Sequence, residues 1–419
     1  MKSQQILVSS PDLRPSLYSV LEGMQKSGIL GKLVTPIAVK KKSLLPPITS
    51  FLFSKNFSDR LQKRVIPEHL SPALKTFPAR HLMLMAVQRL RRDRWTHAVW
   101  RWAELGFDKD VARHYAGRYE YCYGMEHASL ETFRQQKTKG GKCFLRLVIA
   151  HGQIIYRMLE QQMKQWPQWV TPYHHLLLTE SQQILERKKA EYEFSDLIIA
   201  NSEYVRDSLT QEGIASEKVV AIPTGFPTVK HILREKTPHG PIIFLYVGQM
   251  SFRKGIPYLL EAWKDLKINS GAQLWLAGPS ELGGSATEHY FNIPGVRYWG
   301  SVSSSKLKEL YQQAHVFVLP TLLEGLSHAI LEAMAYGLPV ITTAESGIGG
   351  FLHSQENGWK IQAANTGSLK EAMEQALVKK NELESMGQAS RQIAASWTVE
   401  DSNREHLSAI QKYMKLGKA

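Results

Sequence analysis

The sequence predicts an α/β protein with two doubly wound domains that face a central cleft. From residue 241 onward, short β-rich runs alternate with amphipathic stretches of helical length, which is typical of βαβ units and a parallel sheet. The first 222 residues show the same alternation less regularly. At 419 residues, the chain is also long enough for two or three domains of roughly 150 residues each.

In the second half, apolar periodicity changes repeatedly between that of a strand and that of a helix. Strands are expected over 242–247, 273–277, 296–299, 316–319 and 339–342, and helices over 256–266, 304–313 and 327–336. Gly337 is expected to end the last of these helices, because a glycine just before Pro339 is a typical stop signal. This half therefore predicts one doubly wound domain.

The first half yields a second series of elements. Strands are expected over 6–9, 33–34, 119–123, 143–150, 197–200 and 219–222, and helices over 17–26, 129–137, 182–193 and 202–212. Residues 40–80 contain five prolines and predict an elaborated surface region without regular structure. Residues 223–240 are the best candidate for an interdomain linker. We therefore expect domains over 1–230 and 231–400, and a final helix over 401–419 whose packing partner the sequence leaves open. The first domain is expected on the acceptor side of the cleft, and the second is expected to bind the donor.

The composition excludes several classes of protein. With 43% hydrophobic and 21% charged residues, the chain is not disordered, collagenous or a coiled coil. Two cysteines are too few for a disulfide framework or a cysteine-rich zinc site. No segment approaches the roughly 18 apolar residues that a membrane span needs, and the apolar run at residues 6–8 is too short for a signal peptide. We expect a cytoplasmic protein.

The positive charge lies entirely in the first half. Before residue 241, 36 basic residues stand against 22 acidic ones, and after it 16 stand against 16, so the first half carries the whole net charge of +14. This asymmetry indicates an anionic partner such as a phosphate, a nucleic acid or a membrane, although a solvated basic face is the alternative. No helix-turn-helix, zinc-finger or RNA-recognition motif is recognisable, which disfavours nucleic acid.

The most specific stretch is LPTLLEGLSHAILEAMAYGLPV, residues 319–340. It predicts a strand end, a turn that presents Glu324 and Gly325, and a helix that carries His328 and Glu332. Free backbone N–H groups at the start of such a helix attract a phosphate. The pattern therefore suggests a bound nucleotide diphosphate with one carboxylate toward each end of it, although a single glutamate on an amphipathic helix is usually only solvated.

These residues resemble the retaining glycosyltransferases of family 4, which have the GT-B fold of two Rossmann-like domains. Glu324, seven intervening residues, Glu332, and the Ala-Met-Ala, Gly337 and Pro339 that follow are similar to that family's E-x7-E motif. The resemblance implies that Glu332 binds the ribose hydroxyls of a nucleoside diphosphate sugar and that Glu324 is catalytic and binds the transferred sugar. Gly325 and His328 are expected to belong to the same donor site. Ionised carboxylates suit both tasks because they accept several hydrogen bonds.

A second block, LYVGQMSFRKGIPYLLEA at residues 245–262, looks like the start of the family's second domain. By resemblance, Gly248 forms the tight turn and Lys254 neutralises the donor diphosphate. The family usually has arginine directly after that glycine, whereas this chain has Gln249, and we expect Arg253 to supply the missing charge. No metal-binding Asp-x-Asp motif is evident, so the sequence predicts no metal and no cofactor beyond the donor, and cations must offset the charge of the leaving diphosphate.

Resemblance in the first half is limited to strand ends. IAHG at residues 149–152 looks like the family's strand-end His-Gly, which implies a catalytic His151 near the transferred sugar. Glu126 and His127 occupy a similar position after the strand expected over 119–123. A lone histidine is more often structural, so both histidines carry that alternative. The glycine-rich loop common after the first strand is absent, since residues 9–16 are SSPDLRPS.

The stretch from Phe77 to Trp102 combines apolar, basic and aromatic residues. His81 precedes an apolar run, and Arg89, Arg91, Arg92 and Arg94 precede Trp95, Trp100 and Trp102. This pattern is typical of a helix that lies in a membrane interface. The alternative is a helix whose apolar face is buried in the protein and whose arginines are exposed to solvent.

We therefore expect a glycosyltransferase of the hexosyltransferase type that uses a nucleotide-sugar donor, retains anomeric configuration and docks peripherally on the inner membrane face. The alternatives are another GT-B enzyme such as a sugar-nucleotide epimerase, a silent nucleotide-sugar binding module, or a basic nucleic-acid binder. The sequence does not identify the base or the sugar of the donor. The acceptor is also not identified, although the basic first half would suit a lipid-linked or anionic molecule. The oligomeric state is left open.

Overall fold

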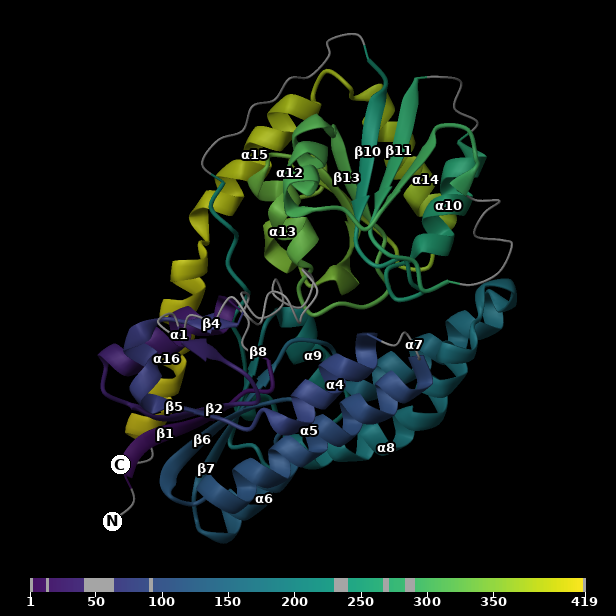
Figure 1. Ribbon diagram of the computed structural model, residues 1–419. Helices are drawn as coiled ribbons and strands as arrows, with labels where there is room; N and C mark the ends of the chain where they lie inside the picture. Colours follow the sequence, from purple (N-terminus) through teal and green to yellow (C-terminus); the bar gives the residue numbers. More distant parts are fainter. Residues whose placement is uncertain are drawn as a thin grey trace, which may run out of the picture.

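Two parallel β-sheets, one in each half of the chain, organise the protein (Figure 1). The computed structural model describes residues 3–12, 15–40, 64–89, 93–229, 240–266, 271–282 and 291–416. The predicted α/β class with two doubly wound domains is confirmed, because the strands of each sheet pair in parallel and helices cover their faces. Among the described residues, no helix combines the length and apolar character required to cross a membrane.

The first sheet has seven strands in the order β5-β2-β1-β6-β7-β8-β9. They are β1 (Ser3–Ser9), β2 (Leu30–Thr35), β5 (Leu74–Thr76), β6 (Tyr119–Met125), β7 (Lys142–Leu147), β8 (Leu197–Ala200) and β9 (Val219–Ala221). The expectation of no regular structure over 40–80 is wrong at four places. β5 extends the sheet edge, β4 (Val65–Ile66) pairs with β3 (Val39–Lys40), Glu68–Ala73 form a 3-10 helix, and a further helix begins at Ala79. These strands are too short for alternating hydrophobicity to reveal them. Residues 41–63 lie outside the described part.

The second sheet has six strands in the order β12-β11-β10-β13-β14-β15. Five of them match the predicted strands within one residue at each end: β10 (Ile242–Val247), β11 (Ala272–Ala277), β12 (Val296–Gly300), β13 (Val316–Leu319) and β14 (Val340–Thr343). These five strands are predictable from the sequence because parallel strands are buried on both faces and therefore consist of near-continuous apolar runs. The sixth strand, β15 (Gly358–Ile361), was not predicted. Helices on this sheet are α10 (Ile256–Asp265), α12 (Ser304–Gln313), α13 (His328–Ala335), α14 (Thr366–Val378) and α15 (Leu383–Ser396).

Helices cover both faces of the first sheet. One face carries α1 (Pro15–Lys26), and the other carries a larger helical layer (Figure 1). That layer contains α4 (Ala79–Arg89), α5 (Asp93–Tyr115), α6 (Leu130–Thr138), α7 (Gly152–Gln165), α8 (Pro172–Phe194) and α9 (Glu203–Gln211). The helix expected over 182–193 is only the second half of α8.

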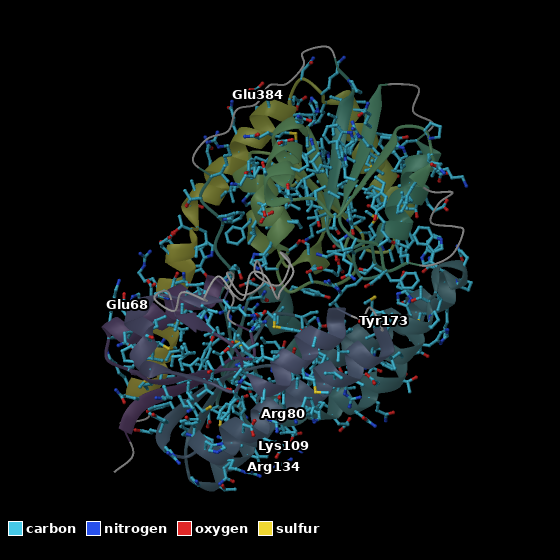
Figure 2. All side chains as sticks on the ribbon, in the orientation of Figure 1. Glu68, Arg80, Lys109, Arg134, Tyr173 and Glu384 are labelled. Atoms are coloured by element: carbon cyan, nitrogen blue, oxygen red, sulfur yellow. The ribbon has the colours of Figure 1, made fainter. Side chains whose placement is uncertain are left out.

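The α7–α8 hairpin extends from the first domain to the second. Its tip is a single 3-10 turn, Pro167–Trp169, and the Trp169 side chain is fully buried in the hydrophobic core of the second domain. Tyr258 of α10 donates a hydrogen bond to Gln162 of α7 at 2.9 Å, and the His174 ring lies 4.8 Å from that of Phe252. Figure 2 labels Tyr173 beside this junction. The hairpin therefore ties the two domains together on one side of the molecule.

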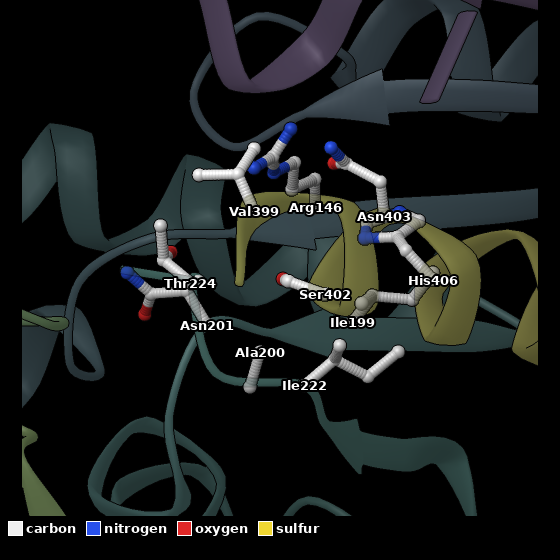
Figure 3. A pocket seen from close by; sticks show the side chains of 11 residues that line it. Arg146, Ile199, Ala200, Asn201, Ile222, Thr224, Val399, Ser402, Asn403 and His406 are labelled. Atoms are coloured by element: carbon white, nitrogen blue, oxygen red, sulfur yellow. The ribbon is translucent and has the colours of Figure 1, made fainter. Parts of the chain in front are cut away.

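The final helix, α16 (Val399–Leu416), returns to the first domain and packs on α1. The chain crosses between the domains twice at one place, where the Phe226 amide donates to the Trp397 carbonyl at 2.9 Å. Figure 3 shows residues of α16, among them Ser402 and His406, around a small pocket at this crossing. His406 Nε2 lies 2.8 Å from the Tyr123 hydroxyl of β6, so the packing partner that the sequence left open is the first sheet.

Replacement of Ile410 should destabilise the first domain although it lies near the C-terminus. Its side chain is fully buried in the hydrophobic core of that domain, and deletion of buried methylene groups leaves a cavity. We expect Ile410→Ala to lower the free energy of unfolding by about 2–5 kcal/mol in urea titrations. The exposed Lys412→Ala is the control and should change it by less than about 0.5 kcal/mol. Equal values for both variants would contradict the docking of α16.

Candidate functional site

A cleft of about 1080 Å³ lies between the two domains, where strands of the first sheet have their carboxyl ends. Ligands of open parallel sheets bind at this edge. The second domain contributes Glu324, Leu326 and His328, which follow β13. The first domain contributes strand-end residues such as Glu126 and His127. The cleft is therefore lined from both domains and is large enough for two small ligands at once.

Gly325 sets how closely the two domains approach each other. A Cβ atom at this position would lie only 1.8 Å from the carbonyl oxygen of Val148, at the end of β7. The Gly325 carbonyl accepts a hydrogen bond of 2.5 Å from the Ser202 hydroxyl, and the preceding Glu324 amide donates to the Glu345 carbonyl at 2.8 Å. Only glycine fits at this position, because any side chain would collide with the Val148 carbonyl. The contacts of Gly325 and Glu324 hold the Glu324 side chain at the cleft wall.

Two cations converge on the Glu324 carboxylate. Lys254 Nζ lies 2.6 Å from Glu324 Oε1, and Arg253 Nη1 forms an ion pair with the same oxygen. Lys254 is 9% exposed, and burial lowers its pKa although the Glu324 carboxylate opposes this shift. Gly255 makes the turn possible, because its φ is 70° and a Cβ atom would lie 1.9 Å from the Pro320 carbonyl. The structure thus brings together three of the predicted donor residues.

Gln249 points to a different partner. Its amide donates a hydrogen bond of 2.6 Å to Glu281, so it does not join Arg253 and Lys254 at Glu324. Gly248 lies beside Lys254, since a Cβ atom there would be 3.7 Å from Lys254 Cε. Arg253 therefore lies beside Lys254 at Glu324 whereas Gln249 does not, and the replacement of the missing arginine by Arg253 stays a prediction.

Glu332 lies on α13, away from the cation pair. Its Oε2 accepts a hydrogen bond of 3.0 Å from the Tyr311 hydroxyl, and burial raises its pKa although this bond opposes the shift. His328, at the start of the same helix, is exposed at the cleft. Glu324 and Glu332 therefore occupy distinct environments, one bound by cations and the other by a hydroxyl.

His151 caps a helix. It is 2% exposed, its Nδ1 accepts a hydrogen bond of 3.2 Å from the Gln153 amide at the start of α7, and its ring lies 5.2 Å from that of Tyr192. Burial lowers its pKa, so the neutral ring is favoured. It is not among the described residues that line the cleft. A catalytic role for His151 stays a prediction, and His127 is the strand-end histidine that reaches the cleft.

His127 is held rigidly at the cleft. Its φ is 75°, a left-handed conformation that costs a non-glycine residue free energy. Its Nδ1 lies 2.8 Å from Glu104 Oε2, and Trp100 of α5 stacks on its ring at 5.2 Å with an interplanar angle of 6°. Strain held by several contacts at a cleft is typical of a functional position.

Glu126 and Lys188 form an ion pair beside His127. Lys188 Nζ lies 2.9 Å from Glu126 Oε2, and the other carboxylate oxygen accepts a hydrogen bond from the Tyr192 hydroxyl. Glu126 and Lys188 both line the cleft. Sequence reasoning missed Lys188, and the signal that could have found it is the spacing of Ile184 and Lys188, one helical turn apart on α8.

The fully buried carboxylate of Glu191 binds the backbone of the segment that begins at His127. Glu191 accepts hydrogen bonds from the amides of His127, Ser129 and Leu130 at 2.6, 2.9 and 3.0 Å. Burial raises its pKa to about 8, while the backbone bonds and Arg187 lower it. No local motif marks Glu191, because the backbone amides that it binds lie more than sixty residues away. In the described part of the chain, no three His, Cys, Asp or Glu residues are grouped to hold a metal ion.

Comparison with known proteins shows what the second domain resembles. Residues 230–393 match the family model of glycosyl transferases group 1. The amylovoran biosynthesis glycosyltransferase AmsK of Erwinia amylovora is 26% identical over 223 residues, which cover 50% of this chain and 54% of that protein. The first curated relatives are matched over about a third to three fifths of their length. The resemblance of the second half to glycosyltransferases is confirmed.

Solved structures match over the whole chain. A sucrose-phosphate synthase from Thermosynechococcus elongatus superposes with a TM-score of 0.63 at 18% identity, covering 99% of this chain and 100% of that one. Anabaena Alr3699/HepE in complex with UDP-glucose superposes with a TM-score of 0.60 at 14% identity, covering 97% and 99%. At these identities the likeness shows the fold alone, and it confirms the GT-B arrangement of the two domains.

Replacement of Glu332 by glutamine should stabilise the protein at neutral pH. Because burial raises the folded-state pKa of Glu332, the folded protein keeps this proton to higher pH than the unfolded chain. The free energy of unfolding therefore falls as pH rises from the unfolded to the folded pKa, and the ionised carboxylate costs free energy above it. We expect Glu332→Gln to be more stable than wild type at pH 8 in urea titrations, with a smaller difference near pH 4.

The exposed Glu371→Gln serves as the matched control for this measurement and should show no such pH-dependent gain. A Glu332→Gln variant that is less stable than wild type at pH 8 would show that the hydrogen bond from Tyr311 outweighs the cost of burial.

Proposed function

We propose, from the group 1 glycosyltransferase domain in residues 230–393 and the GT-B fold around it, that the protein transfers a sugar from a nucleoside diphosphate sugar to an acceptor with retention of configuration. The observation that carries the proposal is the convergence of Arg253 and Lys254 on Glu324 at the cleft wall. Two adjacent cations match the two phosphates of the donor, and the neighbouring carboxylate matches the hydroxyls of its sugar.

The leaving diphosphate explains why both cations are needed. Cleavage of the bond between sugar and phosphate builds negative charge on the diphosphate, and preorganised cations stabilise that charge. Lys254 is largely removed from water, so its interaction with a phosphate is stronger than at an exposed position. A bound diphosphate competes with Glu324 for these cations, which leaves the Glu324 carboxylate available to the donor sugar.

We expect the transfer to retain the anomeric configuration of the donor sugar. No protein nucleophile has been identified, and the resemblance to family 4 favours departure of the diphosphate and attack by the acceptor on the same face of the sugar.

Glu332 is the carboxylate for the ribose hydroxyls of the donor. HepE, which shares the fold, was solved with UDP-glucose, so uridine diphosphate is the first nucleotide to test. AmsK is named for amylovoran biosynthesis, which supports a carbohydrate product.

Binding and turnover test the donor site. In calorimetry with UDP, GDP and ADP, we expect one nucleotide to bind, and Glu332→Ala to weaken it by about 1–3 kcal/mol through loss of charged hydrogen bonds. Arg253→Ala and Lys254→Ala should each lower release of the nucleoside diphosphate from its sugar by about ten-fold or more. The exposed Lys264→Ala is the control for loss of one positive charge.

The two variants at the cation pair separate the competing outcomes. Lower turnover for Lys254→Ala together with wild-type turnover for Arg253→Ala would exclude Arg253 as the second charge. Consumption of a nucleotide sugar to an isomeric nucleotide sugar, without a released diphosphate, would favour an epimerase. Nucleotide binding without any turnover in a screen of nucleotide sugars would favour a silent binding module.

Peripheral contact with an anionic membrane is a second part of the proposal. On α4 and α5, Leu82, Met83 and Trp102 are 45%, 53% and 49% exposed, and the Arg80 guanidinium lies 5.5 Å from the centre of the Trp102 ring. Figure 2 shows Arg80 on the same domain as Lys109 and Arg134. Exposed apolar side chains beside cations suit the interface of a bilayer.

Trp100 is not part of this surface, because it stacks on His127. The side chains of Arg89, Arg91, Arg92, Arg94 and Trp95 lie outside the described residues.

Vesicle sedimentation tests this contact. Binding should increase with the fraction of phosphatidylglycerol in phosphatidylcholine vesicles, decrease with added salt, and fall in the double variant Leu82→Ser, Met83→Ser. Val378→Ser is the control, since Val378 is 84% exposed on the second domain. Equal recovery in the supernatant with neutral and anionic vesicles at low salt would leave this face as a solvated surface.

A further inference from the structure

Three buried polar atoms at the first-domain end of the cleft, or beside the residues that line it, lack a hydrogen-bond partner among the described residues. They are His81 Nδ1, Arg64 Nη1 and Tyr18 Oη. His81 is only 6% exposed, and His81 and Arg64 both line the cleft together with Asp12. An unsatisfied buried polar atom destabilises the folded state, and buried polar atoms in native proteins are almost always paired. Three such atoms in one place indicate a site that a ligand completes.

The charges of this cluster select the chemistry of that ligand. Burial lowers the pKa of His81 to about 4, with smaller contributions from Arg64 and Arg80, so the ring is neutral at physiological pH. A neutral imidazole offers one donor and one acceptor. Asp12 Oδ1 lies 4.0 Å from Arg64 Nη2, so a carboxylate accompanies the guanidinium. A hydroxyl, which both donates and accepts, suits such a mixture, whereas a phosphate only accepts and is repelled by Asp12.

Other charges along the cleft are also compensated. Lys188 is paired with Glu126 at 2.9 Å, and His127 lies 2.8 Å from Glu104. Among the described residues that line the cleft, Arg64, Arg146 and Lys188 stand beside the carboxylates of Asp12, Glu104, Glu126 and Glu324, so this part of the wall has no excess of positive charge. Apolar side chains complete its wall, including Ile37, Leu84, Met85 and Trp100. Apolar and aromatic surface beside paired polar groups suits the C–H faces and hydroxyls of a sugar ring better than it suits an anion.

We infer that the acceptor bound at the first-domain end of the cleft is a neutral glycan, whose hydroxyls bind Asp12, Arg64 and His81. This inference rests on the proposed transferase function, because it gives the second substrate a place opposite Glu324. It also replaces the anionic acceptor that the overall charge of the first half favoured. Leu84 and Met85 then contact the apolar face of the sugar.

Binding of the full-length protein to an array of neutral and acidic glycans tests this site. We expect neutral glycans to bind, and Asp12→Asn and His81→Phe to weaken that binding by about ten-fold, the effect of losing a hydrogen bond to a charged or buried group. His81→Phe preserves the size of the ring, and Asp12 is exposed, so Asp12→Asn does not perturb the core. The exposed His114→Phe on α5 is the matched control and should bind as wild type.

Preferential binding of acidic glycans, binding of no glycan, or wild-type binding by both site variants would each overturn the inference. Calorimetry with UDP, GDP and ADP on the same samples separates this failure from failure of the proposed function. A protein that binds one of these nucleotides but no neutral glycan refutes the acceptor site alone, whereas a protein that binds none of these nucleotides refutes the transferase proposal as well.

Discussion

The close contact between Gly325 and the end of β7 is the constraint on which the cleft depends. A side chain at this position would collide with the Val148 carbonyl, and the Ser202 hydroxyl binds the Gly325 carbonyl from the first domain. The residue before this contact is Glu324, so the approach of the two domains also determines where its carboxylate lies. A larger residue would separate the domains and move Glu324 away from the first-domain side chains of the cleft.

Charged groups on the two sides of the cleft are held in different ways. On the second domain, Arg253 and Lys254 bind one carboxylate oxygen of Glu324, an arrangement that an incoming anion can exchange. On the first domain, the backbone amides at His127 are bound by the buried Glu191, which no ligand can reach. The first arrangement fits the proposed binding of a diphosphate, and the second makes this wall of the cleft rigid.

Long-range connections make the two domains one structural unit. The α7–α8 hairpin buries Trp169 in the core of the second domain, while α16 brings the end of the chain back to the first sheet. Each domain thus contributes part of the packing of the other. Changes in the relative position of the domains must repack these contacts, since packed cores shift between discrete arrangements rather than deform continuously.

Apolar runs, turn residues and the helix stop at Gly337 are local signals, and they predict the class of fold and five of the six strands of the second sheet. Arg253, Lys254 and Glu324 are identified by the resemblance of their two segments to family 4 glycosyltransferases. Only the tertiary structure decided which strand-end histidine reaches the cleft, and it brought Asp12, Arg64 and His81 together. Those contacts join helices and strands distant in the sequence, and periodicity within one element carries no information about which other element it meets.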